Sequence, residues 1–307
     1  MTSINTNRAA MTALASLNAT SAKLDATQQR ISTGLRVNSA QDNAAYWSIA
    51  TTMKSDNSSL STVKDALGLG AATVDVTYTA LNSVITVTQQ IKDKLVAAMQ
   101  PGVDKVKIQA DITSLQNQLK STAASANFSG SNWLSEDSSD PGYNATKSIV
   151  SSFQRDANGI KIQTITFDGT TSKLFDPSNQ SGILDTVSTT VNGAVNYSVS
   201  TLDISALTTS PNDTADLTQM MKTVDGALSS MTTSAANLGA MKTRIDSQSS
   251  FISSLMDAIT RGVGTLVDAD MSEESTKLQA LQVQQQLGTQ ALSIANQSSQ
   301  SILSLFK

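Results

Sequence analysis

Hydrophobic residues recur at alternating intervals of three and four along most of the chain, which places them on one side of an α-helix. The pattern covers residues 14–35, 49–98, 108–119, 217–266 and 278–306. The second and fourth of these segments each correspond to about 50 residues, or ~75 Å of helix. Two long stripes that run in opposite chain directions suit an antiparallel coiled coil. We therefore predict a mostly α fold built on long antiparallel coiled-coil helices.

Leucine and isoleucine form most of the predicted contact stripe in both terminal segments. The stripe comprises Leu14, Leu17, Leu24, Ile31 and Leu35 in the first segment, and Leu278, Leu281, Leu292, Ile302 and Phe306 in the last. In the fourth segment the predicted stripe passes through Met221, Leu228 and Lys242.

Both terminal segments also carry a second apolar stripe. In the last segment it is formed by Val283, Leu287, Ile294 and Leu305, and in the first by Met11 and four alanines between residues 15 and 26. A hairpin of the two helices leaves one stripe of each in water, and each large side chain then forfeits roughly 1.5–3 kcal/mol of burial. We interpret these stripes as surfaces that other copies of the chain cover, because a heterologous contact repeated without closure builds a filament. The alternative is that the middle of the same chain folds back over its ends.

The helical period disappears between Asn127 and about Ser210. Turn-forming sequences dominate there, and residues 160–167 (IKIQTITF) alternate in the manner of a β-strand. Asp168-Gly169 and Asn192-Gly193 are typical of hairpin turns. We predict a small β-rich insertion.

Proline and capping residues mark the predicted helix ends. Pro101-Gly102 ends the second segment, and Pro211 closes the insertion, with residues 212–214 as caps of the next helix. Asp270 with Glu273 resembles a capping box that starts the last helix.

Gly34 weakens the first helix, and Ser39 with Asp42 resembles a capping box for a new one. The stretch between them is therefore a predicted joint between two packed layers.

The composition excludes several classes of function. The chain has 307 residues without cysteine or histidine, which excludes disulfides, thiolate metal sites and histidine-based catalysis. Its 21 lysines and arginines are spread evenly, and the net charge is −4, which disfavours nucleic acid as a partner. No apolar run is long enough to span a membrane, and the N-terminus does not resemble a cleavable signal peptide. We predict no cofactor, no metal, no nucleic-acid partner and no membrane insertion.

Four stretches near the ends form long, specific motifs: INTN (4–7), ISTGLRVNSAQDNAAYWSIA (31–50), LGAMKTRI (238–245) and residues 268–307, which begin DADMSEES. Together they resemble the two terminal regions of the bacterial flagellins. Residues 140–210 resemble nothing in that family.

The resemblance implies a terminal coiled-coil core domain, a helical rod domain and a small β-rich outer domain. Mapped onto this chain, the core domain comprises residues 1–40 and 267–307, the rod domain 41–145 and 211–266, and the outer domain 146–210. The implied function is that of a structural subunit that self-assembles into the helical flagellar filament used for swimming. The family also implies export to the outside of the cell without a cleaved signal. Its partners would be copies of itself, sibling flagellins, an export chaperone, and cap and hook-junction proteins.

The family pattern makes the predicted joint a spoke that links core and rod. Arg30, Arg36 and Asp42 would then tie the joint to neighbouring copies by polar contacts; the alternative is an ordinary solvated loop. Two departures stand out: Asn43 replaces a usual aspartate, and Tyr46-Trp47 replaces a usual Gly-Leu pair. Trp47 either fills a contact or belongs to the rod core.

A further departure concerns the stretch that innate Toll-like receptors read in many flagellins. It aligns with Gln89, Gln90, Ile91, Lys92, Asp93 and Lys94. Here Gln90 replaces an arginine and Lys94 a leucine, so we hypothesise weak detection by that receptor. The alternative is that this face simply packs or is solvated.

Two other functions fit parts of the sequence. A hook–filament junction protein shares such termini, but the full C-terminal motif favours a filament subunit. A metal or enzyme module would rest on Asp268, Asp270, Glu273 and Glu274, which helix capping and favourable first-turn charges explain equally well. Because the serines lack the usual activating partners, we predict that the chain is not an enzyme.

Overall fold

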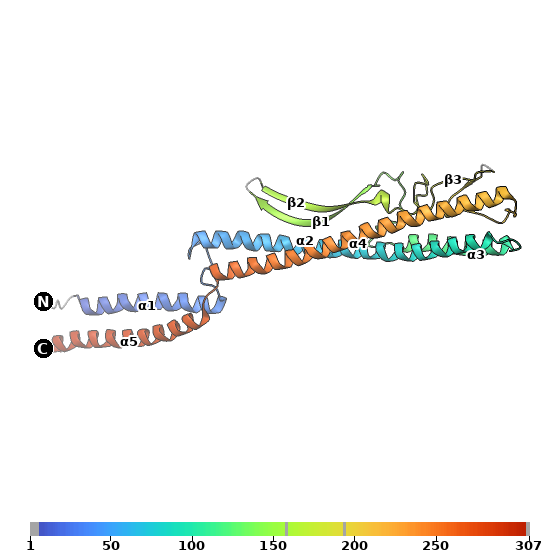
Figure 1. The fold of residues 1–307 in the computed structure, drawn as a ribbon. Helices are drawn as coiled ribbons and strands as arrows, with labels where there is room; N and C mark the ends of the chain where they lie inside the picture. The colour runs from blue at the N-terminus through green and yellow to red at the C-terminus, as the bar shows by residue number, and fades with distance from the viewer. Residues whose placement is uncertain (1–5, 157–158, 193–194, 305–307) are drawn as a thin grey trace. The chain divides into compact units, whose positions relative to one another are not determined.

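The computed structural model describes residues 6–156, 159–192 and 195–304. The chain divides into a terminal unit (residues 1–58 and 256–307) and a central unit (residues 59–255). The fold is mostly α, as predicted, with a small antiparallel β portion (Figure 1). Its helices are α1 (Arg8–Thr33), α2 (Ala44–Ala98), α3 (Lys105–Ser125), α4 (Pro211–Val267) and α5 (Met271–Ser304), and its strands are β1 (Thr146–Asp156), β2 (Gly159–Asp168), β3 (Ser188–Thr189) and β4 (Asn196–Tyr197).

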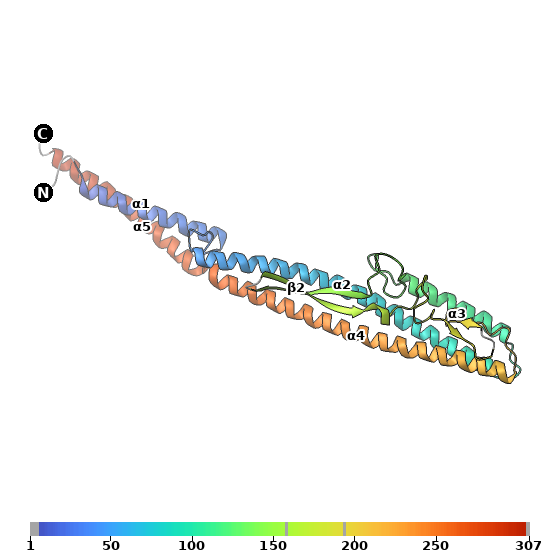
Figure 2. The ribbon, with the colours of Figure 1, turned by 90° about the horizontal axis from the view of Figure 1, so that it is seen from above.

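Helices α1 and α5 of the terminal unit lie side by side and antiparallel (Figures 1 and 2). The Asn7 amide donates to the Ala295 carbonyl at one end of the pair, over 2.9 Å, and Arg30 meets Glu274 at the other. A Cβ atom on Gly288 would lie 3.2 Å from Leu17 Cδ1, so this glycine lets the helices approach closely. The less exposed positions of α5 step by four and three: Glu274, Leu278, Leu281, Gln285, Gly288, Leu292 and Ala295.

One residue of the predicted α1 stripe lies outside this contact. Leu17, Leu24 and Ile31 are at least partly buried, but Leu14 remains 47% exposed. The less exposed position beside it is Ala13. The alternating spacing fits either residue, and the larger side chain was the wrong choice because the close helix approach favours alanine.

Helices α2 and α4 run antiparallel with a constant register. In the central unit Asp75 pairs with Lys242 and Lys92 with Asp225, so the residue numbers change by equal and opposite steps. The predicted stripe of α2 is confirmed from Leu60 to Ala98, where every member is buried. Residues that fill it include Leu67, Leu81, Ile91 and Leu95.

The predicted stripe of α4 is wrong at three of the positions named above, although Ala235, another predicted member, is buried. Met220, Ala227 and Met241 are buried where Met221, Leu228 and Lys242 were expected. Every second residue of the predicted stripe also belongs to the buried stripe that the structure shows, so the spacing of apolar residues does not distinguish the two stripes. Lys242 instead reaches sideways to Asp75, because a cation avoids a helix interface without a buried partner.

Helix α3 anchors the irregular segment that leads into α4. Asp104 caps the helix by accepting hydrogen bonds from the main-chain N–H groups of Val106 and Lys107. The Gln116 amide donates to the carbonyls of Val199 and Leu202, each over 3.1 Å. These bonds satisfy main-chain groups that lie outside regular secondary structure.

The insertion contains one long hairpin, which lies along the α2–α4 pair of the central unit (Figures 1 and 2). Strands β1 and β2 pair antiparallel with Ile149 opposite Ile165, and a bulge interrupts the register between Val150 and Ser152. A Cβ atom on Gly70 of α2 would overlap Ile149, so this glycine admits the strand. The predicted strand at 160–167 and the small β portion are confirmed.

The hairpin turn predicted at Asp168-Gly169 is wrong. Asp168 ends β2 opposite Thr146 and caps a short 3₁₀ helix by accepting a hydrogen bond from the Thr170 N–H over 3.0 Å. An aspartate before glycine serves a cap as readily as a turn. The strands instead connect after Asp156, through two residues outside the described part. Asn192 lies between β3 and β4, and Gly193 is outside the described residues.

A buried ionic cluster holds the loops of the insertion together. Asp176 accepts hydrogen bonds from Lys173 Nζ, Ser138 Oγ and Ser181 Oγ, each over 2.6 Å. Burial alone would raise the pKa of Asp176, but these hydrogen bonds outweigh it and hold the pKa well below its usual range. Burial raises the pKa of the neighbouring Asp185.

Candidate assembly surface

Several exposed apolar side chains of the terminal unit lie on the faces that α1 and α5 turn away from each other, and Tyr46, Trp47 and Ile49 are exposed on α2. On α5, Leu287 is 58% exposed and Ile294 67% exposed, and Val283 shares their face. On α1, Leu14 and Met11 are exposed in the same way. Each helix thus has one apolar stripe against its partner and a second stripe without cover in the described chain.

The predicted interface residues divide between these two faces. Leu17, Leu24, Ile31, Leu278, Leu281 and Leu292 lie on the α1–α5 contact, whereas Leu14, Leu287 and Ile294 are exposed. Leu35 packs into a small core below the helix pair. The side chain of Ile302 and residues Leu305 and Phe306 lie outside the described part.

Two connectors meet at the predicted joint, and main-chain hydrogen bonds hold them together. Gly34 ends α1 with φ of 72°, a left-handed conformation that glycine adopts without strain. The N–H groups of Arg36 and Val37 both donate to the Val267 carbonyl, over 2.7 and 3.2 Å. The Ala269 N–H returns a bond to the Gly34 carbonyl over 2.9 Å. The α1–α2 and α4–α5 connectors therefore form one bridged structure.

Below this bridge a compact apolar core fixes the start of α2 against the end of α4. It contains Val37, Ala50, Val263 and Val267, all less than one-tenth exposed. Helix α2 begins at Ala44 and not directly after Ser39, the predicted cap. Its cap is Asn43, whose Oδ1 accepts from the Tyr46 N–H over 3.1 Å, so the departure from aspartate keeps the capping function.

The polar residues expected to contact neighbouring copies are bonded within their own chain. The Arg36 guanidinium donates to the Leu266 carbonyl over 3.0 Å. Asp42 Oδ2 accepts from the N–H groups of Ser39 and Asn38 over 2.9 and 3.1 Å. These main-chain hydrogen bonds lower the pKa of Asp42. The joint is thus an ordered turn. Ser39 and Asp42, predicted to cap the start of a helix, instead hold this turn together by hydrogen bonds.

The other helix starts are close to expectation. Asp270 Oδ1 accepts from the N–H groups of Ser272 and Glu273 over 2.9 and 3.3 Å, which confirms the cap of α5. Helix α4 begins at Pro211, before the predicted caps at residues 212–214. Proline suits the first position of a helix. Its cap is Ser210, whose Oγ accepts from the Asp213 N–H over 3.2 Å.

Glu274 lies in the α1–α5 contact, a position that the sequence analysis does not assign to it. Glu274 was interpreted as a first-turn charge, but it occupies a contact position of α5 and is only 5% exposed. Arg30 Nη1 donates to its Oε1 over 3.2 Å. The spacing of four and three from Glu274 to Leu278 and Leu281 was a signal that could have placed it in the contact.

The six residues aligned with the receptor-read stretch belong to the packed α2 helix. Ile91 is fully buried, while Gln89, Gln90 and Asp93 are exposed. Lys92 pairs with Asp225 over 2.7 Å and Lys94 with Asp111 over 2.5 Å. Both lysines therefore bridge α2 to neighbouring helices.

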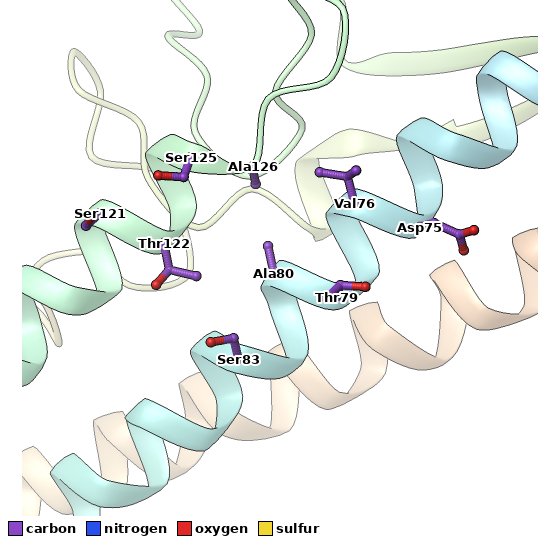
Figure 3. A pocket seen from close by; sticks show the side chains of 9 residues that line it. All are labelled: Asp75, Val76, Thr79, Ala80, Ser83, Ser121, Thr122, Ser125 and Ala126. Atoms are coloured by element: carbon purple, nitrogen blue, oxygen red, sulfur yellow. The ribbon is translucent and has the colours of Figure 1, made fainter.

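An open groove of about 560 Å³ lies between α2 and α3 (Figure 3). Apart from Asp75, it is lined by small aliphatic and hydroxyl side chains: Val76, Thr79, Ala80, Ser83, Ser121, Thr122, Ser125 and Ala126. Within the described part of the chain, no three acidic residues gather into a group that could hold a metal ion. Likewise, none of the helices there has the length and apolarity needed to cross a bilayer.

A helix pair with exposed apolar faces is typical of a structural protein that associates with other chains. A family model described as the bacterial flagellin N-terminal helical region matches residues 4–139, and one for the C-terminal helical region matches residues 221–306. The chain belongs to the bacterial flagellin family. It is accordingly a self-polymerising structural subunit of the flagellar filament, and these matches give no support to the hook–filament junction alternative.

Individual flagellins match over the whole chain. Flagellin C of Rhizobium meliloti (strain 1021) is 51% identical over 326 residues, with 100% of both chains covered. The flagellin of Brucella melitensis biotype 1 is 47% identical over 308 residues, again with 100% of both chains covered. A crystal structure of Bacillus cereus flagellin aligns with a TM-score of 0.39 and 18% identity, over 62% of this chain and 88% of that one.

Proposed function

We propose that the exposed stripes of α1 and α5 are the main assembly surface of this flagellin. In this proposal residues 1–40 and 267–307 form the filament core, 41–145 and 211–266 the rod, and 146–210 the outer part. The residues that carry assembly are the exposed Leu14, Leu287 and Ile294, supported by the α1–α5 contact residues and by Ile302, Leu305 and Phe306.

The observation that carries the proposal is the double apolar character of α5. Its contact stripe is already used by α1, yet Val283, Leu287 and Ile294 form a second stripe in water. Each exposed leucine or isoleucine forfeits roughly 1.5–3 kcal/mol that burial would supply. A second copy that covers this face recovers that free energy in every subunit of the polymer.

The test places a charge on the exposed stripe. Leu287→Asp and Ile294→Asp should each abolish polymerisation, because assembly would bury an unpaired carboxylate. Gln282→Asp is the matched control, since it adds the same charge to α5 on a polar, exposed face. Sedimentation and negative-stain microscopy measure the polymer, and circular dichroism verifies that the monomers are folded. Filaments of normal length from Leu287→Asp and Ile294→Asp would refute the proposal.

We further propose that the protein has no catalytic role and reaches the outside of the cell by the flagellar export route. An export chaperone, cap and hook-junction proteins, and sibling flagellins are the expected partners, as the family resemblance implies. The absence of histidine and cysteine from the sequence supports the non-catalytic part. Pull-down of the flagellar export chaperone by the purified chain would test the export part, and no capture would contradict it.

We also propose weak detection by the innate receptor. Lys94 replaces a leucine and is engaged by Asp111, so this position offers a charge where many flagellins offer an apolar side chain. A reporter-cell assay should show lower potency than a strongly detected flagellin, and Gln90→Arg with Lys94→Leu should raise it. If the unaltered protein is as potent as the strongly detected flagellin, the hypothesis is refuted.

A further inference from the structure

Methionine is the only sulfur-bearing residue type of this chain. The sequence has ten methionines and no cysteine. A peroxide therefore meets no thiol, and the methionine thioethers are the sulfur atoms that it oxidises, to sulfoxides. The peroxide must reach the sulfur atom, so the exposure of each methionine decides which of them react first.

Two of the methionines that the structure describes have exposed side chains. Met11 of α1 is 65% exposed, and Met271, at the start of α5, is 46% exposed. Both belong to the terminal unit. The other described methionines are buried or partly buried: Met53, Met99, Met220, Met221, Met231, Met241 and Met256. A peroxide in solution is therefore expected to oxidise the terminal unit before the central one.

Met11 supplies most of the apolar area on the outward stripe of α1. The rest of this stripe is formed by small, exposed residues: Ala15, Ala19, Ala22 and Ala26. Apolar area is what a covering chain recovers on burial, and a methionine side chain presents far more of it than an alanine. An oxygen atom added to the Met11 sulfur would place a polar S=O group at the largest residue of the stripe.

We propose that Met11 is an oxidation site whose state controls whether a free subunit assembles. The inference rests on the assembly surface proposed above and adds its regulation. In the reaction a lone pair of the Met11 sulfur attacks one oxygen of hydrogen peroxide, and the O–O bond breaks. The sulfur loses two electrons and keeps that oxygen, whose proton joins the departing hydroxide as water. The peroxide is thus reduced to water, and the thioether is oxidised to the sulfoxide.

Free and polymerised subunits respond differently to the oxidant. In the free subunit Met11 is open to solvent and reacts. In the polymer a second copy covers the stripe and shields the sulfur. A subunit that was oxidised before assembly must bury its sulfoxide among alanines, where the S=O group loses water without gaining a donor. Oxidation therefore withholds free subunits and spares assembled ones, and sulfoxide reductases can reverse the block.

The first experiment compares peroxide treatment before and after assembly. Hydrogen peroxide is added to free subunits and to preformed filaments, and peptide mass spectrometry follows the sulfoxide at Met11. We expect much slower oxidation of Met11 in filaments. Subunits oxidised beforehand should show a critical concentration for polymerisation that is raised roughly tenfold. Equal rates of Met11 oxidation in subunits and filaments would overturn the proposal.

Two substitutions separate Met11 from the other methionines. Met11→Leu removes the sulfur and nearly conserves the volume, so this variant should polymerise normally even after peroxide treatment. Met271→Leu is the matched control, because it removes the other exposed thioether of the described chain. It should lose assembly after peroxide as the unaltered subunit does. If Met11→Leu is as sensitive to peroxide as the unaltered subunit, another residue is responsible and the proposal is wrong.

Met11→Gln imitates the sulfoxide without any oxidant. Glutamine is a polar side chain of similar length and has nearly the helix propensity of methionine. This variant should raise the critical concentration roughly tenfold. Thr12→Gln is the control, since Thr12 is exposed and lies off the stripe, and it should change the critical concentration less than about twofold. Circular dichroism verifies that both monomers keep their helix content. Normal polymerisation of Met11→Gln would contradict the proposal.

Leu287→Asp distinguishes a failure of this inference from a failure of the assembly surface. If Leu287→Asp blocks polymerisation but Met11→Gln does not, the surface stands and control through Met11 is refuted. If Leu287→Asp and Met11→Gln both form normal filaments, the assembly surface itself fails, and this inference fails with it. Loss of polymerisation in both variants, with rescue of peroxide-treated subunits by Met11→Leu, is the result that we expect.

Discussion

The terminal and central units are built from the same kinds of helix but close their interfaces to different degrees. In the central unit, α2 contributes Leu67, Leu81 and Ile91, which are fully buried. In the terminal unit, the contact between α1 and α5 combines leucines with small residues such as Ala13 and Gly288, and Leu287 and Ile294 lie outside it. The central unit therefore closes its α2–α4 contact with large side chains, although it also exposes apolar residues such as Ile162 and Phe251. The terminal pair leaves Leu287 and Ile294 exposed, and this is the surface that we propose copies of the chain cover.

Polar groups show the same difference. The buried Asp176 of the central unit has Lys173 and two serines around one oxygen and N–H donors on the other. The buried Glu274 of the terminal unit has a partner on one oxygen only. The central unit thus satisfies both oxygens of this buried carboxylate, and the terminal unit leaves one oxygen of Glu274 without a hydrogen bond among the described residues.

Removal of the terminal helices gives the largest expected difference between the units. Deletion of residues 1–35 or 275–307 should abolish polymerisation and leave the central unit folded, because its core lies between residues 59 and 255. Circular dichroism and thermal unfolding measure the fold, and sedimentation measures the polymer. Loss of the cooperative unfolding transition in either deletion would show that the two units do not fold separately.

A pair of leucine truncations sharpens the comparison at single residues. Leu81→Ala in the central unit should cost about 2–5 kcal/mol in the free energy of unfolding, because the site is fully enclosed. Leu17→Ala in the terminal unit should cost less than about 1 kcal/mol in the monomer, because the side chain is only partly buried. Urea unfolding of both variants measures the difference. Equal losses would mean that the terminal pair is as well packed as the central one.

The ionic cluster of the central unit predicts a smaller, pH-dependent effect. The pKa of Asp176 is lowered in the folded state, so its stabilising contribution is complete above the unfolded pKa of about 4 and is lost as the pH falls below it. The raised pKa of Asp185 acts in the opposite sense, because its protonation in the folded state relieves the burial of charge. Urea unfolding between pH 7 and pH 3 should therefore show stability falling below about pH 4.

Asp176→Asn is the variant that isolates this cluster. It should lower stability at pH 7 by roughly 3–5 kcal/mol at most, because Lys173 is left buried without its counter-charge. It should also flatten the loss of stability at low pH. A variant with the same pH profile as the unaltered protein would assign the acid sensitivity to other carboxylates.

The helices and the existence of the β insertion could be predicted from sequence because periodicity extends over many residues. Leu60 to Ala98 repeats the same spacing often enough that one misplaced residue changes nothing. The contact residues at alternate positions were harder to predict, because Leu14 and Ala13 satisfy the spacing equally well, as do Met221 and Met220. Which of them faces the partner depends on how closely two helices approach, and that distance is set by residues far away in the chain, such as Gly288.

Short polar signals were the least reliable guide because one residue type serves several purposes. Asp168-Gly169 caps a 3₁₀ helix instead of turning a hairpin, and Ser39 with Asp42 locks a turn instead of starting a helix. Glu274 was correctly placed in the first turn of α5, but its burial depends on Arg30, at the opposite end of the sequence. Pairing across the whole chain is not visible in a local pattern.

The bridge between the two connectors has a mechanical consequence. Arg36, Val37 and Ala269 join the connectors through main-chain atoms, so tension applied to either helix of the terminal pair is divided between both connectors. Main-chain bonds of this kind do not depend on which side chains surround them. Load sharing at this point can therefore persist through extensive sequence divergence, while the surfaces on either side of it change.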